Sequence, residues 1–531
     1  MQTRRPAGTR WIVALVAFAG VVNLIVLLGQ LPALVRSLYR NADSATALVL
    51  ADGLGAGHET PRLVTLGHYH YYEAWLLEKA TAGLPDHWQL WEAIPVLLAF
   101  FAIALMVWTA WRALGTFAAL LTGVIMVALG DEMREILFTP DTHGYFVVHT
   151  ALLAATLVFL ADRAARDRLT WPLLIGVGVP LAALSTLGAT DQLFEFVALP
   201  SFVLAGCLGW WRHPGAKERN IAIFCVAVGA IVIVGCQLLD KAMIEGGVIS
   251  QFFPVSFVGA EALFANLQVT VTAVAFLGGG QFWGAPLKGT ELLVFAVGAL
   301  ALVGVGILLR LLWRYAGSLG ARERSTSGCR EIYLAFWMFV VVISLLVFTL
   351  SSLPSGLATA RYLPGVFAGS AALLPGLVTP SARGRVRLAM AVAFFAILVA
   401  VNHVIEGSAP SPLGPSRAAS YEILKYVRAE DAAHGYAPYW DASAMAWQTR
   451  GTLRVYPAIP YGPGLHPFPF NEISTWYKPV AGVRSFLVSD SRPVPESFSV
   501  APVTLGKPVN VAVFGPYTVD IYDHDIAENL G

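Results

Sequence analysis

Residues 11–33 read WIVALVAFAGVVNLIVLLGQLPA, a run without a single Asp, Glu, Lys or Arg. A helix of about 20 mostly apolar residues is long enough to cross the hydrocarbon core of a bilayer. Arg4, Arg5 and Arg10 precede the run, which is too long for the apolar region of a signal peptide and has no small-residue cleavage site close behind it. The stretch therefore predicts a first membrane span that stays in the mature protein.

Ten further segments have the same apolar character along the first three quarters of the chain. They are 92–111, 115–130, 145–161, 172–188, 194–211, 221–239, 291–313, 331–352, 363–379 and 387–404. Of the 531 residues, 56% are hydrophobic and 13% are charged, against about 25% charged residues in a soluble protein. The pattern predicts a mainly α fold, a polytopic membrane bundle of about eleven transmembrane helices that forms one domain over 1–404. The net charge of +1 excludes a basic footprint for nucleic acid.

The Lys and Arg residues between the spans predict an orientation. They gather in four clusters, which are Arg163, Arg166 and Arg168; Arg212, Lys217 and Arg219; Arg310, Arg314, Arg322, Arg324 and Arg330; and Arg383, Arg385 and Arg387. With eleven spans all four clusters fall on the side of the N-terminus, which the positive-inside rule places in the cytoplasm. The apolar segment 263–283 would break this pattern as a full span, so we interpret it as a re-entrant or outer-leaflet helix.

Composition changes abruptly at residue 405. The tail 405–531 is rich in Pro, Tyr and Trp, and an amphipathic stretch at 417–433 precedes strand-like runs at 452–456, 484–488, 509–514 and 517–522. These features predict a small extracytoplasmic α/β domain. Its segment GYAPYWDASAMAW, with Tyr439 and Trp440, has the aromatic and acidic character of a carbohydrate surface, but is slightly better explained as part of the domain core.

The long outer loop 36–91 carries the first candidate site. Asp43, just beyond the first span, could deprotonate an acceptor hydroxyl at the membrane boundary, or could simply cap a helix that starts at Ser44. Further on, the loop contains HYHYYE at 68–73, which we expect to contact a sugar or lipid headgroup, with Tyr72 and Glu73 as binding residues. Metal binding by its two histidines is less favoured, because positions i and i+2 do not share one helix face.

Two shorter loops on the same side add acids and a cation. The loop after the third span reads GDEMREILFTPDTHGYF and places Asp131 and Glu132 where a helix leaves the membrane. An ordinary solvated helix end with an Asp131–Arg134 pair is an equal interpretation. The loop before the tenth span reads TARYLPG, and its Arg361 suits bidentate capture of a phosphate. Snorkelling of Arg361 to lipid headgroups explains it about as well.

Taken together, these motifs resemble the GT-C class of integral membrane glycosyltransferases, which use polyprenyl-phosphate-linked sugars. The resemblance rests on an early outer-loop Asp, a second acidic motif after the third span, an outer Arg-Tyr-Leu-Pro before a late span and a closing tail domain. It implies the following site residues: Asp43 as the base, with Asp52 as the fallback; Asp131 and Glu132 as the second acidic motif; Arg361 and Tyr362 as the phosphate-binding pair; and His143 as an assisting residue.

The resemblance implies a function as well. We expect a membrane glycosyltransferase that moves a sugar from a polyprenyl-phosphate donor to a cell-envelope glycan or lipid acceptor on the outer face of the membrane, by inverting displacement. Its partners would be that donor, that acceptor and membrane lipids, in the inner (cytoplasmic) membrane of a bacterium. The resemblance leaves a divalent cation (Mg²⁺ or Mn²⁺) open as a cofactor. Loop 1 lacks the Asp-x-Asp or Asp-Glu pair of that class, which weakens both a required metal and the assignment of the base. A transporter or flippase of a lipid-linked substrate, or a non-catalytic envelope assembly protein, is the alternative.

Overall fold

The computed structural model describes most of the chain. The described residues are 7–55, 63–66, 76, 79–81, 84, 87–139, 143–246, 248–251, 255–280, 289–320, 328–378, 382–406, 414–461, 464–469, 472–494 and 497–530. The motif at 68–73, with the predicted binding residues Tyr72 and Glu73, lies outside these ranges.

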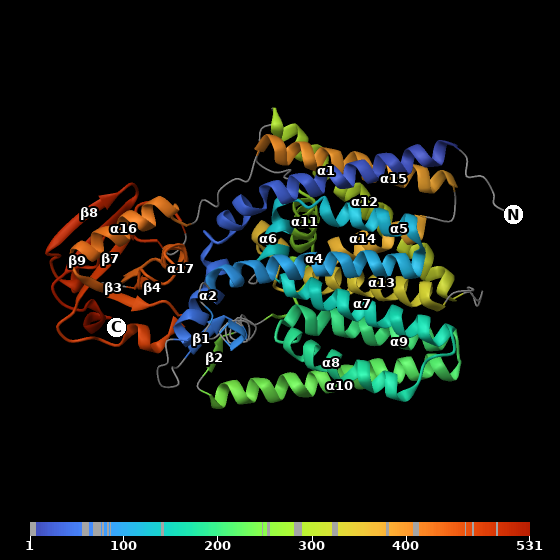
Figure 1. The fold of residues 1–531 in the computed structure, drawn as a ribbon, viewed down its shortest axis with the longest axis horizontal. Helices are drawn as coiled ribbons and strands as arrows, with labels where there is room; N and C mark the ends of the chain where they lie inside the picture. The colour runs from blue at the N-terminus through green and yellow to red at the C-terminus, as the bar shows by residue number, and fades with distance from the viewer. Residues whose placement is uncertain are drawn as a thin grey trace.

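Long apolar helices lie side by side and form the larger part of the molecule (Figure 1). They are α1 (Ala7–Leu38), α4 (His87–Leu114), α5 (Thr116–Val127), α7 (Gly144–Ala165), α8 (Trp171–Gly188), α9 (Leu199–Arg212), α10 (Ala216–Glu245), α12 (Thr290–Gly320), α13 (Gly328–Thr349), α14 (Pro364–Val378) and α15 (Ala382–Glu406). In the part of the chain that the structure describes, ten helices are long and apolar enough to cross a membrane, or eleven if a bent pair is one span. The predicted bundle of about eleven membrane helices is confirmed.

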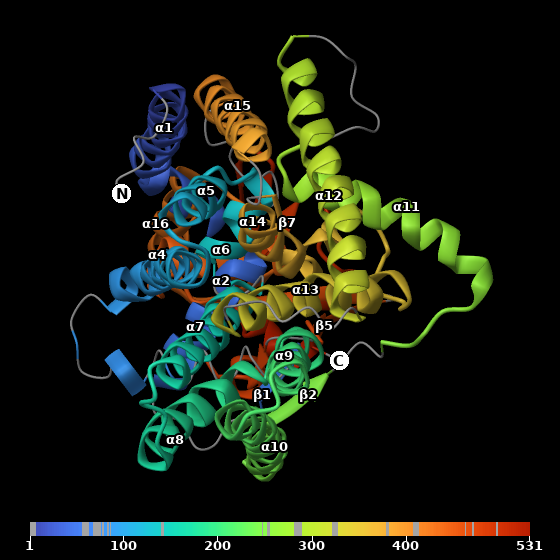
Figure 2. The same ribbon diagram turned by 90° about the vertical axis from the view of Figure 1, so that its right-hand side faces the viewer.

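Two helices differ from ordinary membrane-crossing helices, one in direction and one in length. Helix α11 (Ala260–Leu277) is long and apolar enough to cross a membrane, yet it runs crosswise to the long helices, which Figure 2 shows end-on. Its direction agrees with a segment that lies along the membrane rather than across it. Helix α14 occupies the predicted span 363–379 but has only 15 residues, about 22 Å of helix against about 30 Å of hydrocarbon.

The predicted span 115–130 ends in a sharp bend. Helix α5 is followed after a short break by α6 (Asp131–Phe138), and the two helices meet at 95°. At the bend Gly130 packs directly on the turn that follows α11, where a Cβ on Gly130 would lie 2.4 Å from the backbone nitrogen of Gly279. Only glycine allows so close a contact, and it holds the acidic helix α6 beside the end of α11.

The C-terminal domain is built on a mixed sheet of six strands in the order β5-β4-β3-β7-β9-β8. The strands are β3 (Ala432–Ala437), β4 (Val455–Tyr461), β5 (Gly464–Pro467), β7 (Arg484–Asp490), β8 (Asn510–Phe514) and β9 (Tyr517–Tyr522), accompanied by α16 (Arg417–Ala429) and α17 (Tyr439–Gln448). Strand β3 is parallel to β4 and to β7, and the other pairs are antiparallel. The predicted small α/β domain is confirmed; β3 and β5 are strands that the sequence analysis did not identify.

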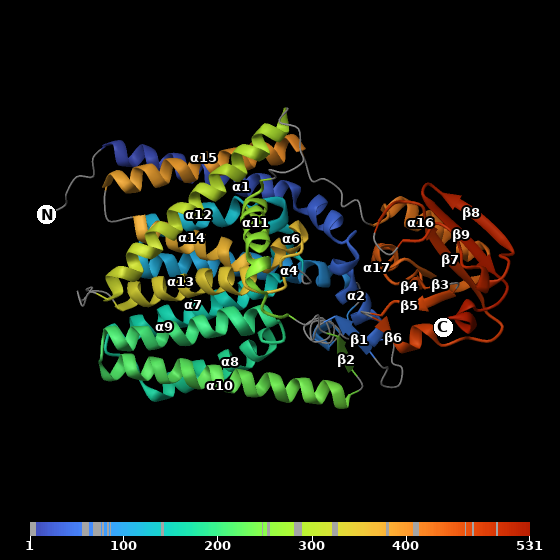
Figure 3. The ribbon, with the colours of Figure 1, turned by 180° about the vertical axis from the view of Figure 1, so that it is seen from behind.

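Helix α2 (Ala42–Gly55) joins the two parts of the molecule. It lies between the bundle and the C-terminal domain (Figure 3), and its buried residues Leu48 and Leu50 belong to the same apolar core as Met445 and Trp447 of α17. The ring of Trp447 stacks on Tyr39 at 5.1 Å between centroids. A second junction is a three-stranded sheet of β1 (Leu63–Leu66), β2 (Val248–Gln251) and β6 (Glu472–Ile473), which come from both parts.

The basic clusters meet at the end of the bundle away from the C-terminal domain. The Arg112 guanidinium pairs with Asp162 at 2.7 Å, and Arg212 pairs with Glu331 at 3.6 Å. Lys217 forms a further ion pair across this end with Asp167. The N-terminal start of α1 lies at the same end, whereas the C-terminal domain lies at the other (Figure 1).

Candidate active site at the domain junction

Helix α2 begins in a way that leaves Asp43 available for chemistry. Asn41 precedes the first helical residue, and its side-chain oxygen accepts a hydrogen bond from the backbone N–H of Asp43 at 3.1 Å. Asn41 is therefore the N-cap residue. The alternative prediction that Asp43 caps a helix starting at Ser44 is wrong, because the helix starts at Ala42 and the Asp43 carboxylate points elsewhere.

The Asp43 carboxylate is held by two residues that are distant in sequence. Its Oδ2 lies 3.4 Å from a terminal nitrogen of Arg361, and its Oδ1 accepts a 2.7 Å hydrogen bond from the Tyr439 hydroxyl. The side chains of Asp43 and Arg361 are 24% and 34% exposed, so solvent or a ligand still reaches the pair. The structure thus brings the predicted base and the predicted phosphate-binding cation into direct contact.

Arg361 lies in a 3₁₀ turn, η2 (Leu357–Tyr362), immediately before α14. Its guanidinium also packs over the ring of Tyr362, at 5.5 Å from the centroid. The Tyr362 ring in turn lies 5.1 Å from the ring of His143, whose Nδ1 is 2.9 Å from the carboxylate of Asp191. Tyr362 and His143 therefore form one wall beside Arg361; their predicted roles in phosphate binding stay predictions.

The acidic helix α6 supplies the opposite wall. Glu135 accepts a hydrogen bond from the Asn41 side chain at 3.0 Å, and both Glu132 and Glu135 interact electrostatically with Arg361. Asp131 lies on another side of the helix and pairs with His403 of α15 at 3.3 Å. The structure thus places Glu132 beside Arg361, while Asp131 is directed toward α15.

Arg134, on the same helix, does not form the ion pair with Asp131 that the alternative interpretation of this loop predicts. Its guanidinium is buried and donates to the side chain of Gln30 in α1 at 3.2 Å. Helix α6 is therefore a packed helix, with its arginine directed into the bundle rather than toward solvent.

Asp52 is not part of this cluster. It follows Asp43 by nine residues on α2, which is about 13 Å along the axis and half a turn around it. Its carboxylate lies 3.7 Å from His87, and burial raises its pKa. The Asp52 side chain thus lies away from Arg361 and lines a different cavity.

In the described structure Asp43 has protein partners rather than a cluster of further metal ligands. Both oxygens of Asp43 already have partners, one of them the cationic Arg361. Within the described ranges no three His, Cys, Asp or Glu side chains are grouped so as to hold a metal ion. No step proposed below uses one.

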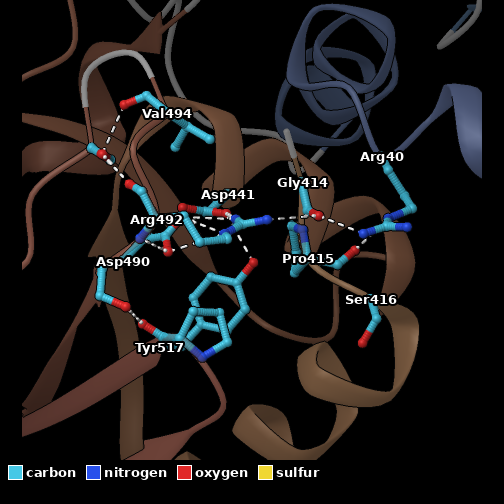
Figure 4. Close-up of polar contacts among 12 residues, drawn as sticks. Arg40, Gly414, Pro415, Ser416, Asp441, Asp490, Arg492, Val494 and Tyr517 are labelled. Atoms are coloured by element: carbon cyan, nitrogen blue, oxygen red, sulfur yellow. Dashed lines mark hydrogen bonds and ion pairs between the residues drawn. The ribbon is translucent and has the colours of Figure 1, made fainter. Parts of the chain in front are cut away.

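The domain junction that positions Tyr439 is held by two arginines (Figure 4). Arg40, at the end of α1, donates to the carbonyl oxygens of Gly414 at 2.8 Å and Pro415 at 2.9 Å. From the domain side, Arg492 donates to the same Gly414 oxygen at 3.4 Å. A Cβ on Gly414 would lie 1.8 Å from the backbone oxygen of Arg40, so the contact requires glycine.

Arg492 also anchors the start of α17, where Tyr439 lies. It donates to Asp441 at 2.9 Å and to Asp490 at 2.7 Å, and both carboxylate side chains are fully buried. Burial and the neighbouring charge of Asp490 raise the pKa of Asp441 well above its ordinary value. Burial alone would lower the pKa of Arg492, but the two carboxylates outweigh it and raise that pKa. The ion cluster therefore fixes the helix whose first residue is Tyr439.

An apolar groove of about 170 Å³ lies between helices of the bundle. Its walls come from α11, α12, α14 and α15. Helix α14 starts three residues after Arg361 and contributes Val366, Ser370 and Leu374 at helical spacing. The groove thus runs along the helix that Arg361 precedes.

Comparison with models of protein families finds no match, and comparison with curated protein sequences finds none. Among solved structures, the chain is similar to ArnT from Cupriavidus metallidurans in the apo state, with a TM-score of 0.48 and 14% identity over 99% of this chain and 100% of that one. ArnT bound to undecaprenyl phosphate gives 0.45 and 14% over 97% and 98%. The Archaeoglobus fulgidus oligosaccharyltransferase in complex with Zn and sulfate gives 0.48 and 14% over 90% and 68%.

Two of the residues that shape the site were not assigned to it from the sequence. Asn41 is an ordinary polar residue until the start of α2 is known. Tyr439 was noted only as part of an aromatic segment, since its contact with Asp43 spans 396 positions. The signal that could have identified Asn41 is its position before a helical run, two residues ahead of an acid.

Proposed function

We propose that the protein is a membrane glycosyltransferase that moves a sugar from a polyprenyl-phosphate donor to a glycan or lipid acceptor of the cell envelope. The observation that carries the proposal is the contact of Asp43 with Arg361 at the membrane end of α2. A carboxylate and a guanidinium lie side by side there, and the helix that follows Arg361 lines an apolar groove.

Arg361 and the groove support a lipid-linked donor. A guanidinium binds a phosphate through two parallel N–H···O hydrogen bonds, and Arg361 retains 34% exposure for this purpose. The residues Val366, Ser370 and Leu374 lead away from it along α14. A polyprenyl chain in this groove would place its phosphate at Arg361 without leaving the apolar layer.

Asp43 is the base in this proposal. Its carboxylate takes the proton of the acceptor hydroxyl while the hydroxyl oxygen forms a bond to the anomeric carbon of the donor. The bond from that carbon to the phosphate oxygen breaks, and polyprenyl phosphate leaves with the electron pair, its charge balanced by Arg361. Attack opposite to the leaving group inverts the anomeric centre.

The orientation in the membrane belongs to the same proposal. The basic end of the bundle faces the cytoplasm under the positive-inside rule. The C-terminal domain and the Asp43 site are at the other end, and thus face the periplasm or cell exterior of a bacterial inner membrane. A reporter fused to the C-terminus that proved cytoplasmic would refute this part.

The test is release of polyprenyl phosphate by the purified full-length protein in nanodiscs, supplied with a panel of short-chain polyprenyl-phosphate sugars and envelope glycolipids. Asp43→Asn and Arg361→Ala are each expected to lower the rate at least 100-fold, since a general base contributes about 10²–10⁴-fold. Matched controls are Asp167→Asn and Arg166→Ala at the basic end, whose side chains are 84% and 53% exposed. Wild-type rates in both site variants would contradict the assignment.

A further inference from the structure

A second cavity, of about 510 Å³, lies on the other face of α2, where that helix meets the C-terminal domain. Asp52 forms part of one wall, and Arg454, Tyr456, Trp476 and Lys478 form part of the other. The volume is in the range of about 300–1,000 Å³ that small-molecule sites occupy. The mechanism proposed for Asp43 uses none of these residues.

The cavity is built by close backbone contacts rather than left by loose packing. Gly451, with a φ of +68°, approaches Asp52 so closely that a Cβ would lie 2.6 Å from its Oδ2. A Cβ on Gly53 would lie 2.6 Å from the side chain of Ile473. Both glycines line the cavity, and each lets the domain and α2 come together without filling it.

Two kinds of side chain in the cavity point to a sugar ligand. The rings of Tyr456 and Trp476 stack on each other at 5.1 Å with an angle of 13° between their planes. Each ring therefore covers one face of the other, and Trp476 is only 8% exposed, so the pair gives the cavity a rigid apolar wall. The Asp52 carboxylate, 41% exposed, can accept hydrogen bonds from sugar hydroxyls. This combination of an apolar body and few polar groups is typical of small-molecule sites.

The cations indicate that the sugar is acidic. Arg454 and Lys478 are exposed side chains that line the cavity, against a single lining carboxylate, Asp52, among the described residues. The surplus positive charge favours an anion, and a guanidinium is suited to a carboxylate or phosphate in particular.

The position of the cavity relates it to the proposed reaction. Asp43 and Asp52 are on the same helix, about 13 Å apart along its axis and on opposite faces. An acceptor of several sugars could therefore reach both. Resting on the proposed transferase function, we propose that this cavity binds an acidic saccharide unit of the acceptor glycan while another unit presents its hydroxyl to Asp43.

Binding is tested without turnover, by saturation-transfer NMR titrations on the full-length protein in phosphatidylcholine nanodiscs. The probes are methyl glucuronide, glucose 6-phosphate and methyl glucoside, so that the carboxylate and phosphate arms are compared with a neutral sugar. At least one acidic probe is expected to bind about tenfold more tightly than the glucoside, equivalent to about 1.4 kcal/mol. Arg454→Gln and Lys478→Gln should each remove most of this preference, and the controls Arg428→Gln and Lys425→Gln, exposed on α16, should not.

The outcomes separate this proposal from the transferase proposal. Asp43→Asn should abolish transfer and leave probe binding unchanged. Arg454-dependent binding in a protein without transferase activity would uphold the acidic-sugar cavity and refute the transferase. Equal binding of acidic and neutral probes, no binding of any probe, or binding that Arg454→Gln leaves intact would overturn the cavity assignment.

Discussion

Asp441 and Asp490 are both buried and both pair with Arg492, but replacing each with Asn should affect the stability of the C-terminal domain differently. Asp490 accepts hydrogen bonds from two guanidinium nitrogens, at 3.0 Å from Nε and 2.7 Å from a terminal nitrogen. Asp441 accepts one from Arg492 at 2.9 Å and one from Tyr517 at 3.3 Å, both through Oδ1. Its Oδ2 is buried without a hydrogen-bond partner in the described structure. Asp490 is therefore the principal partner of Arg492.

The expected change in the free energy of unfolding follows from these contacts. Asp490→Asn places an N–H group where Arg492 needs an acceptor, and removing one member of a buried ion pair costs about 3–5 kcal/mol. Arg492 is 24% exposed and keeps Asp441, so the expected loss is smaller, about 2–3 kcal/mol. Asp441→Asn retains the Oδ1 acceptor and removes a charge that burial disfavours. At pH 5, Asp441→Asn is expected to change the free energy of unfolding by less than about 1 kcal/mol.

The difference in stability between Asp441→Asn and the wild type should change with pH in a defined direction. The pKa of Asp441 is raised in the folded domain by burial and by the charge of Asp490, so the folded state binds this proton more tightly than the unfolded state. The resulting stability is complete below the unfolded pKa of about 3.9 and is lost as the pH rises through the raised folded pKa. Asp441→Asn has no carboxyl proton to release, so it cannot lose this stability. The free energy of unfolding of the variant should therefore rise relative to that of the wild type as the pH rises.

Urea-dependent proteolysis of the C-terminal domain in the full-length protein, at pH 5, 6.5 and 8, measures both effects. Asp490→Asn should unfold at markedly lower urea at every pH. Asp441→Asn should match the wild type at pH 5 and resist higher urea than the wild type at pH 8. An Asp441→Asn variant that is the less stable of the two, or whose difference from the wild type is constant with pH, would refute the account of the cluster.

Three further changes test the junction and the site. Tyr439→Phe removes a hydrogen bond to the charged Asp43, worth about 1.5–3 kcal/mol, and should lower kcat at least about tenfold with the donor KM unchanged; steady-state release of polyprenyl phosphate measures both. Arg361→Lys keeps the charge but loses the planar fork, so it should raise the donor KM about tenfold while retaining more activity than Arg361→Ala. Gly414→Ala places a methyl group 1.8 Å from the Arg40 carbonyl oxygen and should destabilise the docked domain by about 2–3 kcal/mol, measured by the same urea assay.

The membrane bundle was predictable from sequence because lipid imposes one requirement on every span. Each helix must be long and apolar, since the bilayer offers no hydrogen-bond partners to the backbone. The same requirement does not determine direction, and α11 satisfies it while running across the bundle (Figure 2). Its direction depends on contacts such as that of Gly130 with Gly279, which no hydropathy pattern contains.

The domain sheet was predictable only in part. Strand β9 alternates apolar and polar residues, and β7 has a short apolar run at Phe486–Val488. The runs predicted at 484–488, 509–514 and 517–522 overlap β7, β8 and β9. Strand β3 reads AAHGYA, and Ala and Gly have little preference for strands. It is a strand because β4 and β7 flank it on both sides, a tertiary condition that overrides local preference.

In the candidate site, too, some residues were identified from local sequence, whereas others depend on tertiary contacts. Asp43, Arg361, Tyr362 and His143 were named from the family resemblance, and the structure places them in one cluster, while their roles stay predictions. The role of Tyr439 could not be predicted, since it depends on how a domain docks. Asp52 was named as the fallback base, but nine residues along a helix reverse the direction of a side chain, so it lines another cavity than the one beside Asp43.

Helix α2 explains why the soluble domain and the membrane site cannot be treated as separate parts. It has only 14 residues, yet Asp43 near its start takes one partner from the bundle, Arg361, and one from the domain, Tyr439. If the domain moved away, the Tyr439 hydroxyl would leave Oδ1, and Arg361 could pair with both carboxylate oxygens and neutralise the base. The docked domain keeps the two charges in contact through one oxygen only. In the proposed mechanism, the domain would therefore control, by way of Tyr439, whether Asp43 is available to an acceptor hydroxyl.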